Sequence, residues 1–561
     1  MKVVIVGGVA GGASAAARLR RLDEKAEIVV FERSGYMSYA NCGLPYYIGG
    51  TIGEESALTL QTPESFFARF RIEVKVRHEV TAVLPEEKCV LVRELNSGRE
   101  FRESYDKLIL APGASPTRPR LPGIDLDRIF TLRTVEDTLR VKEFVQREKP
   151  RSAILAGGGF IGLELAENLR QLGLEVSIVE GLEQLMSPFD PEMAAFLHGE
   201  VRRCGVKLHL GSFVDGFRES GGGVDVLLKS GETLHGDLVV LAIGVTPDTG
   251  LAKAAGLELG LRGSIVVDEH METSVKDIYA VGDAVQVRQL VTGEAAVISL
   301  AGPANKQGRI AADNICGRPS RYPGTLGTSV IKVFDLAAAS VGINETTAKK
   351  AGLKVDKLYL SPMSHATYYP GGQILNMKIL FEQETWRLLG AQVIGGDGAD
   401  KRIDVLATAI QAGMDVRQLS ELQLAYAPPF AAAKDPINMA GYMAENLSEG
   451  LVKQIHWHDV DGLPRESSVL LDVRTVPEYT AGHAKDFINI PLHELRGRME
   501  EIPRGKPVYV MCQSALRSYI ACRILTQHGL DCWNIAGGYR LYSTVVHEAE
   551  AKKVAAPCGK E

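Results

Sequence analysis

Two of the eight cysteines in this 561-residue chain stand where a thiolate could attack sulfur. The first, Cys42, lies in the polar turn SYANCGLPYY at residues 38–47. A redox pair would place a second cysteine five residues after the first, and Tyr47 occupies that position. Attack on a disulfide leaves a mixed disulfide, which another thiol or a bound reductant must then resolve. The alternatives for Cys42 are oxidation to a sulfenic acid by peroxide and a structural role as a small buried side chain.

The second, Cys512, opens the segment CQSALRS between a predicted strand and a predicted helix, and Arg517 follows five residues later. Successive backbone N–H groups in such a loop can surround a sulfur atom, and the start of a helix lowers the pKa of a cysteine. Cys512 is therefore predicted to carry a terminal sulfur as a persulfide. If the loop requires a positive φ at Ala515, the alanine would be strained, so transfer activity stays open.

Two strand–turn–helix units must position this chemistry. The turn GGVAGG at 7–12 follows the strand KVVIV and precedes a helix, and Glu32 ends the next strand. Gly7 permits the tight turn, Gly12 lets helix and strand approach, and the helix N-terminus offers N–H groups to a pyrophosphate. Glu32 can accept hydrogen bonds from ribose hydroxyls. Although Val9 departs from the GxGxxG pattern, the combination predicts a dinucleotide site.

The second unit, at 152–180, contains the turn GGGFIG, which matches GxGxxG fully, and Glu180 ends its second strand. A carboxylate there accepts a hydrogen bond from a free ribose 2′-hydroxyl and repels a 2′-phosphate, so NADH is favoured while NADPH stays possible. Farther along, Asp283 in VGDA could bind a ribitol hydroxyl or could simply cap a helix.

Composition narrows the class of protein. The net charge of −6 is small for this length and provides no reason to expect nucleic acid as a partner. No apolar run approaches the roughly 18 residues that span a bilayer. The N-terminus begins directly with a strand, so no signal peptide is expected, and the cysteines are dispersed without a metal-binding pattern. These observations favour a cytoplasmic enzyme without a metal.

The sequence resembles a known family. Residues 1 to about 447 resemble the flavin-dependent pyridine nucleotide-disulfide reductases, and are most similar to the single-cysteine branch with coenzyme A-disulfide reductase and NADH oxidase or peroxidase. The resemblance rests on the paired turns, Ser38-x-x-x-Cys42, APGASP, VGDA and AYAPPFAAAKDPINMAG at 425–441. Residues 468–546 resemble a rhodanese domain through LLDVR, EYTAGH, FINIPL, CQSALR and NIAGGY. The whole resembles coenzyme A-disulfide reductase–rhodanese fusions.

The resemblance implies an α/β fold with two Rossmann-like nucleotide-binding domains, an α+β dimerisation domain and a C-terminal rhodanese α/β domain. The expected parts are an FAD-binding domain at 1–118 and 245–325, an NAD-binding domain at 119–244, a dimerisation domain at 326–450, a linker at 451–465, a rhodanese domain at 466–550 and a tail at 551–561. A homodimer is expected.

The turns and the resemblance together indicate the cofactor-binding residues. For FAD they are Gly7, Gly8, Val9, Ala10, Gly11, Gly12, Glu32, Arg33, Gly113, Gly282, Asp283 and Ala301. For NAD they are Gly157, Gly159, Phe160, Ile161, Gly162, Glu180 and Gly244.

The resemblance also implies a coenzyme A site and two further tyrosines. The positions that match coenzyme A contacts are Ser14, Arg18, Arg21, Ser38, Asn41 and Lys434. One basic contact of the family falls on Phe70 here, and Arg69 and Arg71 beside it are expected to substitute. Relatives place two tyrosines of the partner subunit near the redox cysteine, and these would be Tyr368, or the adjacent Tyr369, and Tyr426. Asp472, Arg474 and His483 of the rhodanese segment match signature positions and are expected to be structural.

The predicted activity is NADH-driven, FAD-dependent reduction of coenzyme A persulfide, polysulfide or coenzyme A disulfide through a mixed disulfide at Cys42. Cys512, with Arg517, would handle sulfane sulfur, and Tyr368 and Tyr426 would assist the departing thiolate. Two alternatives remain. One is a peroxidase or oxidase with a Cys42 sulfenate, and the other is a redox-gated binding protein whose rhodanese module is not catalytic. The residues do not rank the sulfur substrates, nor do they show whether Cys42 and Cys512 exchange sulfur.

Overall fold

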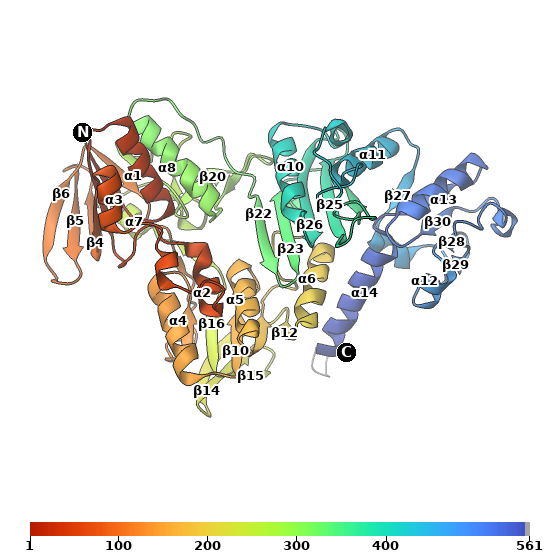
Figure 1. Ribbon diagram of the computed structural model, residues 1–561, viewed down its shortest axis with the longest axis horizontal. Helices are drawn as coiled ribbons and strands as arrows, with labels where there is room; N and C mark the ends of the chain where they lie inside the picture. The colour runs from red at the N-terminus through yellow and green to blue at the C-terminus, as the bar shows by residue number, and fades with distance from the viewer. Residues whose placement is uncertain (556–561) are drawn as a thin grey trace. The chain divides into compact units, whose positions relative to one another are not determined.

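The computed structural model describes residues 1–555, and the tail residues 556–561, with Cys558, lie outside the described part. The chain forms two compact units (Figure 1). The first contains residues 1–183 and 205–327, and the second contains residues 184–204 and those from 328 onward.

The first unit begins with a parallel sheet in the order β19-β7-β1-β2-β3. Its strands are β19 (Ile278–Ala280), β7 (Lys107–Leu110), β1 (Lys2–Val6), β2 (Glu27–Glu32) and β3 (Glu73–Val76). β1, KVVIV, is buried almost throughout, as expected of a strand covered on both faces. Helix α1 (Ala10–Leu22) connects β1 to β2 and packs on α8 (Ala301–Ile315). The Arg18 guanidinium of α1 joins the Asp313 carboxylate of α8 at 2.7 Å, which fastens the two helices together.

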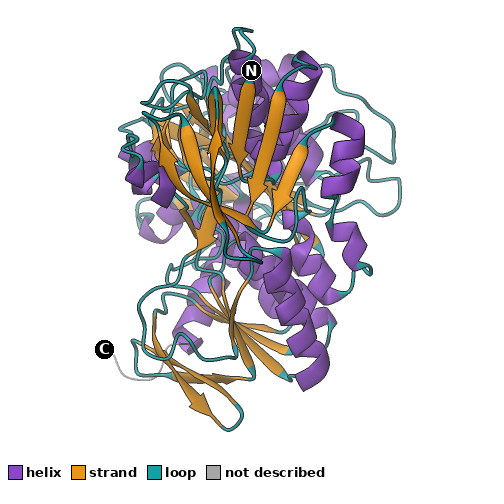
Figure 2. Ribbon diagram, turned by 90° about the vertical axis from the view of Figure 1, so that its left-hand side faces the viewer, coloured by secondary structure: helices purple, strands orange, loops and turns teal. Residues whose placement is uncertain are grey.

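A second parallel sheet repeats this plan in the order β12-β11-β10-β16-β9. Its strands are β12 (Val206–His209), β11 (Glu175–Val179), β10 (Ser152–Ala156), β16 (Leu238–Leu241) and β9 (Ile129–Thr131). Helix α5 (Phe160–Gln171) connects β10 to β11, and α4 (Val135–Glu148) follows β9. Figure 2 shows helices of the first unit (purple) beside its strands (orange). Because all strands in each sheet are parallel, their carboxyl ends meet at one edge, where ligands bind in such folds.

The second unit contains an antiparallel sheet in the order β22-β23-β26-β25-β24. Its strands are β22 (Ser329–Val333), β23 (Leu336–Gly342), β26 (Leu388–Gly395), β25 (Leu375–Glu382) and β24 (Val355–Leu360). Helix α6 (Pro191–Arg203), which the sequence places in the NAD-binding domain, packs on this sheet within the second unit. The buried Lys378 ammonium lies 2.7 Å from Asp190, 2.5 Å from Glu192 and beside Glu345. Lys378 thus partly compensates the charge of this carboxylate cluster and ties α6 to β25.

The last domain has a parallel sheet in the order β27-β31-β30-β28-β29. Its strands are β27 (Lys453–Ile455), β31 (Cys532–Ile535), β30 (Val508–Met511), β28 (Val469–Asp472) and β29 (Ile488–Asn489). Residues 453–455, expected in a linker, form β27 and pair with β31, because an added strand satisfies backbone groups that a linker would leave to water. The α/β fold class predicted from the sequence is confirmed by this arrangement.

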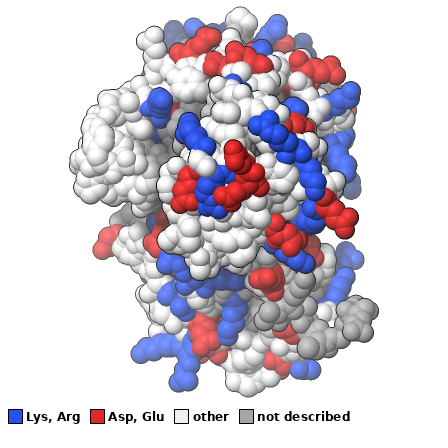
Figure 3. Space-filling view, turned by 90° about the vertical axis from the view of Figure 1, so that its right-hand side faces the viewer, with Lys and Arg blue, Asp and Glu red and all other residues white. Residues whose placement is uncertain are grey.

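The surface carries charges of both signs, and the described helices are of limited length and apolarity. Lys and Arg side chains intermingle with Asp and Glu on the face shown in Figure 3. Among the residues that the structure describes, no helix is both long and apolar enough to traverse a bilayer.

Candidate active site

Cys42 lies at the surface of the first unit, in a short 3₁₀ turn, Asn41–Gly43, directly before helix α2 (Leu44–Gly49). Partial burial raises the pKa of the thiol, and the carboxylates of Glu164 and Asp283 act in the same direction, while the Arg133 guanidinium opposes them. The protein groups alone therefore hold Cys42 as a neutral thiol near pH 7. Thiolate chemistry at this residue requires a change in its surroundings.

Arg133 connects two predicted site residues, although the sequence provides no motif that identifies it. Its guanidinium donates to the Asp283 carboxylate at 2.7 Å. With the Asn41 amide oriented to satisfy its neighbours, the amide nitrogen donates to the Arg133 carbonyl oxygen at 2.9 Å, and the amide oxygen accepts from the guanidinium at 3.2 Å. Asn41 and Asp283, which are distant in sequence, are thus joined beside Cys42 by one side chain.

The predicted FAD residues converge at the carboxyl edge of the first sheet. The Glu32 carboxylate at the end of β2 accepts from the backbone N–H groups of Gly8 and Ser34, each at 2.8 Å. Arg33 is paired with Asp248 at 2.9 Å. The N-terminus of α1 has no side-chain cap, so its N–H groups stay available. The same edge also carries Gly113 after β7, Gly282 and Asp283 after β19, and Ala301 at the start of α8.

The predicted NAD residues repeat this geometry at the second sheet. Glu180 accepts from the N–H groups of Gly158 and Leu182, each at 2.7 Å, and α5 also begins without a side-chain cap. Gly157 has a φ of +114°, and a Cβ atom there would lie 2.3 Å from the Ala242 carbonyl oxygen, so only glycine fits the turn. Gly159, Phe160, Ile161 and Gly162 form the start of α5, and Gly244 follows β16. Uncapped N–H groups at both turns fit the pyrophosphates of FAD and NAD.

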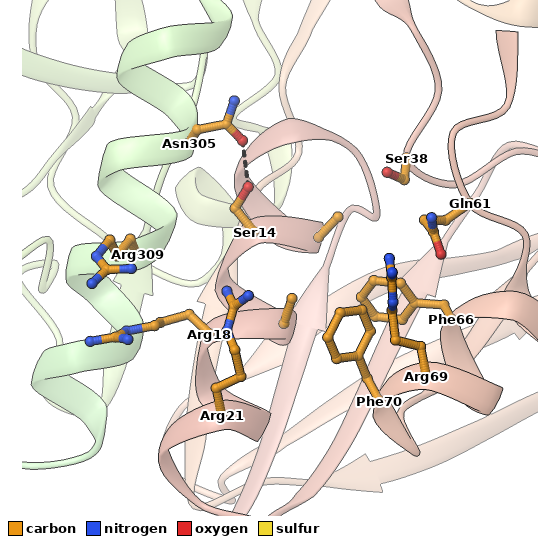
Figure 4. Close-up of a pocket in the computed structure, with 12 residues that line it drawn as sticks. Ser14, Arg18, Arg21, Ser38, Gln61, Phe66, Arg69, Phe70, Asn305 and Arg309 are labelled. Carbon is orange, nitrogen blue, oxygen red and sulfur yellow. Dashed lines mark hydrogen bonds between the residues drawn. The ribbon is translucent and has the colours of Figure 1, made fainter. Parts of the chain in front are cut away.

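A cavity of about 370 Å³ opens between α1, α3 (Pro63–Phe70) and α8 (Figure 4). Five of the eight predicted coenzyme A residues line it: Ser14, Arg18, Arg21, Ser38 and Arg69. The structure adds seven residues that were not predicted to line it: Ala13, Ala17, Gln61, Phe66, Phe70, Asn305 and Arg309. The Ser14 hydroxyl donates to the Asn305 side-chain oxygen across the α1–α8 contact. Asn305 and Arg309 lie about 290 residues after α1 in the sequence, and nothing in the sequence of α8 predicts that it lines this cavity.

The arginines that line this cavity differ in whether a carboxylate compensates their charge. Arg18 is paired with Asp313. Arg21, Arg69 and Arg309 have no carboxylate partner among the described residues, although Arg69 lies over the Phe70 ring at 5.9 Å. Three uncompensated guanidinium groups around one cavity fit a polyanion, because arginine recognises phosphates through charge-assisted hydrogen bonds.

Three predicted coenzyme A residues do not line the cavity. Asn41 lies in the Cys42 turn, as described above. Arg71 ends α3 in a left-handed conformation with its guanidinium 5.3 Å from the Phe67 ring. Lys434 is exposed in the second unit.

The two predicted catalytic tyrosines lie together in the second unit. The hydroxyl groups of Tyr368 and Tyr426 are 2.6 Å apart, and this hydrogen bond raises the pKa of Tyr368. Their side chains are 73% and 47% exposed, unusual values for tyrosine, and Phe430 nearby in the chain is 72% exposed. Tyr426 and Phe430 also line a cavity of about 730 Å³ in this unit. The pairing brings together two residues that are 58 positions apart in sequence.

In the last domain, Cys512 directly follows β30 and begins a loop that leads into α13 (Leu516–Gln527). Its Sγ atom accepts from the Ser518 hydroxyl at 3.3 Å. The sequence raised the possibility of a strained alanine in this loop, and Ala515 indeed has a φ of +69°. Arg517 binds both carboxylate oxygens of Glu478 on α12 (Val476–Thr480), at 2.8 and 2.6 Å, and this contact lowers the pKa of Glu478 to about 2. At neutral pH the positive charge of Arg517 is therefore compensated by the Glu478 carboxylate.

Two other signature residues of this domain form a buried ion pair. The Arg474 guanidinium binds both oxygens of Asp472, and it also contacts the Gln513 side chain of the loop. His483 stacks on the Tyr479 ring, with the ring centroids 3.9 Å apart. These contacts support the structural role expected for the three residues.

We expect replacement of Glu478 by glutamine to lower the KM for thiosulfate in a cyanide–thiosulfate assay by about three-fold, because the positive charge of Arg517 beside Cys512 would no longer be compensated by a carboxylate. Glu501→Gln provides a control, since Glu501 is a carboxylate paired with Arg498 in the same domain. An unchanged KM in E478Q, with C512S as the blank, would argue against this electrostatic effect.

Three comparisons place this geometry among known proteins. Residues 1–308 match the family model of the pyridine nucleotide-disulphide oxidoreductases, residues 328–436 match the dimerisation domain of these proteins, and residues 457–544 match the rhodanese-like domain. The coenzyme A disulfide reductase of Staphylococcus aureus (strain JH9) is 35% identical over 445 residues, which is 79% of this chain and 100% of that protein.

Two solved structures are similar over nearly the whole chain. The reduced CoADR-RHD of Bacillus anthracis is 47% identical, with a TM-score of 0.95 and 98% of each chain covered. An NAD-dependent persulfide reductase from A. fulgidus is 38% identical, with a TM-score of 0.91 over 97% of this chain and 100% of that one. The resemblance predicted from the sequence is thereby confirmed. The chain belongs to the pyridine nucleotide-disulphide oxidoreductase family, which implies FAD and a nicotinamide nucleotide, and it carries a dimerisation domain and a C-terminal rhodanese-like domain.

Proposed function

We propose that this enzyme uses NADH to reduce coenzyme A persulfide, polysulfide or coenzyme A disulfide through a mixed disulfide at Cys42. The observation that carries the proposal is a single exposed thiol in the same unit as a cavity lined by three uncompensated arginines. The names of the relatives from Staphylococcus aureus and A. fulgidus support the same substrate class.

The cavity suits the nucleotide end of coenzyme A. Arg21, Arg69 and Arg309 supply positive charge for phosphate groups, and Phe66 and Phe70 offer aromatic surface for a base. Because Ser38 lies both on the cavity wall and four residues before Cys42, we propose that an extended thiol arm passes along this segment to the cysteine.

The proposed reaction consists of a thiol–disulfide exchange followed by a two-electron reduction. The Cys42 thiolate attacks the coenzyme A sulfur of CoA–S–SH, the S–S bond breaks, and hydrosulfide leaves while Cys42–S–S–CoA forms. With coenzyme A disulfide the leaving group is the coenzyme A thiolate. FAD, held by the turn at residues 7–12, would supply the two electrons from NADH that cleave the mixed disulfide. Each sulfur keeps one electron pair, and the coenzyme A thiolate takes a proton and departs. Arg133 and Asn41 hold the Cys42 turn during these exchanges.

We further propose that Cys512 carries sulfane sulfur as a persulfide and that the Tyr368–Tyr426 pair assists the thiol of a second copy of this chain. The matched dimerisation domain and the high exposure of both tyrosines support a homodimer. Lys434 and Arg71 remain proposed coenzyme A contacts.

Glu180 is proposed to select NADH. We expect Glu180→Gln to reduce the ratio of kcat/KM for NADH over NADPH by about ten-fold, because the carboxylate repels a 2′-phosphate. Steady-state kinetics with both nucleotides test this. Glu175→Gln, on the same strand but paired with Lys207, should leave the ratio unchanged. An unaltered ratio in E180Q would show that selectivity lies elsewhere.

Mass spectrometry of the purified protein provides the direct test of the proposed function. A coenzyme A adduct on the peptide that contains Cys42 is expected, removable by NADH. Turnover of NADH is then compared with coenzyme A persulfide, hydrogen peroxide and oxygen as acceptors. Faster turnover with peroxide or oxygen, without an adduct, would reject the proposal in favour of a sulfenate-based peroxidase or oxidase.

A further inference from the structure

His365 lies three residues before Tyr368 and is buried, with 8% of its surface exposed. Its Nδ1 atom lies 3.1 Å from the Ala366 carbonyl oxygen, and the Tyr369 ring meets the imidazole edge-on with the ring centroids 5.7 Å apart. Because a carbonyl oxygen only accepts hydrogen bonds, Nδ1 carries the proton of the neutral ring. The other nitrogen, Nε2, has no hydrogen-bond partner among the described residues and is left as an acceptor.

The imidazole and the tyrosine pair share one cavity. His365 and Tyr426 both line the cavity of about 730 Å³ in the second unit, and the Tyr426 hydroxyl lies 2.6 Å from that of Tyr368. The two segments that carry these residues are fastened together, since the Ala366 N–H donates to the Ala431 carbonyl oxygen at 3.1 Å. A cavity of this size has room for water, through which a proton can pass between groups that do not touch.

The other titratable or charged groups on this cavity differ from His365 in their chemistry. They are Tyr369, Asp397, Lys401, Arg402 and Tyr426. The Arg402 guanidinium forms a buried ion pair with Asp435 at 2.8 Å, and it also donates to the Ser364 carbonyl oxygen at 2.9 Å. Asp397 and Lys401 contribute one charge of each sign. Histidine is thus the one lining residue of a type that exchanges protons near neutral pH.

Proton donation by the tyrosine pair alone is unfavourable. A phenol has an ordinary pKa of about 10 and a thiol one of about 8.5, so a tyrosine is the weaker acid and gives its proton to a thiolate at a cost. The hydrogen bond between the two hydroxyl groups raises the pKa of Tyr368 and increases this difference. An imidazolium group has an ordinary pKa of about 6.5, so a proton that comes from it makes the overall transfer favourable.

We propose that His365 resupplies the proton that the Tyr368–Tyr426 pair gives to the departing coenzyme A thiolate. One hydroxyl of the pair transfers its proton to the thiolate sulfur, and the imidazolium Nε2–H returns a proton to the phenolate through the cavity. The neutral imidazole then takes a proton from solvent, and no electrons are exchanged. His365 acts through the tyrosines, so it is a positioning residue for this proton. The inference rests on the proposed function in that it takes the tyrosines as the proton donors.

The test measures kcat for coenzyme A disulfide with NADH between pH 6 and 9, in the wild type and in His365→Asn. The asparagine amide can keep the N–H bond to the Ala366 carbonyl oxygen but does not titrate. Because the protonated imidazole is the donor, kcat of the wild type should fall as the pH rises. We expect H365N to lower kcat about ten-fold at pH 6.5, to lose this pH dependence and to keep the wild-type KM. His493→Asn, an exposed histidine of the last domain, should match the wild type.

His365→Ala adds a measurement that a purely structural role would not change. The substitution leaves space in the cavity for a free imidazole molecule. Added imidazole should raise kcat of H365A by about three-fold or more, with the larger effect at low pH, and should leave the wild type unaffected. A wild-type pH profile in H365N, or an H365A enzyme that imidazole does not reactivate, would overturn the inference.

Tyr426→Phe separates this inference from the proposed function. If the tyrosines donate the proton, Y426F lowers kcat, and adding H365N to Y426F causes no further loss, because both residues serve the same proton. A loss in Y426F with wild-type kcat in H365N would overturn the inference and leave the proposed role of the tyrosines. Wild-type kcat in Y426F would reject that role and the inference with it.

Discussion

Replacement of Cys42 by serine is expected to lower NADH-driven release of sulfide from coenzyme A persulfide by three orders of magnitude or more, on the order of what loss of a covalent nucleophile costs. Serine is nearly isosteric, but its hydroxyl cannot form a disulfide. The turn itself contains a single thiol, and Tyr47 occupies the place of a partner. The measurement is sulfide release together with NADH oxidation at saturating substrate.

Two controls make this result specific. Cys316→Ser alters another incompletely buried cysteine of the same unit, at the end of α8, and should retain turnover. Transfer of sulfur to cyanide by Cys512, where the wild type shows it, should survive in C42S and would demonstrate that the last domain is intact. Sulfide release by C42S at the wild-type rate would contradict the proposed mixed disulfide.

Combined replacement of Arg21 and Arg309 by glutamine is expected to raise the KM for coenzyme A disulfide by about 100-fold with little change in kcat. Among the residues that the structure describes, neither arginine has a carboxylate partner, so each can form a charge-assisted hydrogen bond with phosphate, which contributes roughly 1.5–3 kcal/mol. Such contacts are made equally in the ground state and the transition state, so they affect KM rather than kcat. The single variants should each account for about ten-fold.

The substrate provides the sharpest control for this prediction. Pantethine, the disulfide that lacks the phosphorylated nucleotide, should be reduced equally well by the wild type and by the double variant. Lys306→Gln removes an exposed positive charge from the same helix α8 without touching the cavity, and its KM should match the wild type. An equal rise in KM for both disulfides would show that the arginines do not bind the nucleotide part of coenzyme A.

The nucleotide turns could be predicted from sequence because their chemistry is local. A short apolar strand, a glycine turn and a helix within some 30 residues specify where a pyrophosphate fits, and Glu32 and Glu180 each come at the end of the following strand. The structure supplies a detail that the pattern lacks. Both carboxylates accept from two backbone N–H groups and so also brace the turns themselves.

Only part of the wall of the proposed coenzyme A cavity could be predicted from the sequence. Ser14, Arg18 and Arg21 share one face of α1, and helical spacing alone brings them together. Asn305 and Arg309 share a face of α8 in the same way, but no local rule pairs α8 with α1. Arg71 shows the reverse case. Adjacency to Arg69 suggested a shared role, whereas the left-handed end of α3 turns Arg71 toward Phe67.

The sequence by itself determined the types and spacing of the candidate functional groups: a cysteine without a partner thiol, two dinucleotide turns, and a second cysteine in a loop that closes with Arg517. These features depend only on residue types and short sequence spacings, so they can be recognised without knowledge of the fold. Only the tertiary structure decided what surrounds them. It placed Arg133 between Asn41 and Asp283 and set Glu478 against Arg517. The physical reason is that the ionisation of a thiol depends on charges and burial within a few ångströms, and those neighbours come from segments that are far apart in the chain.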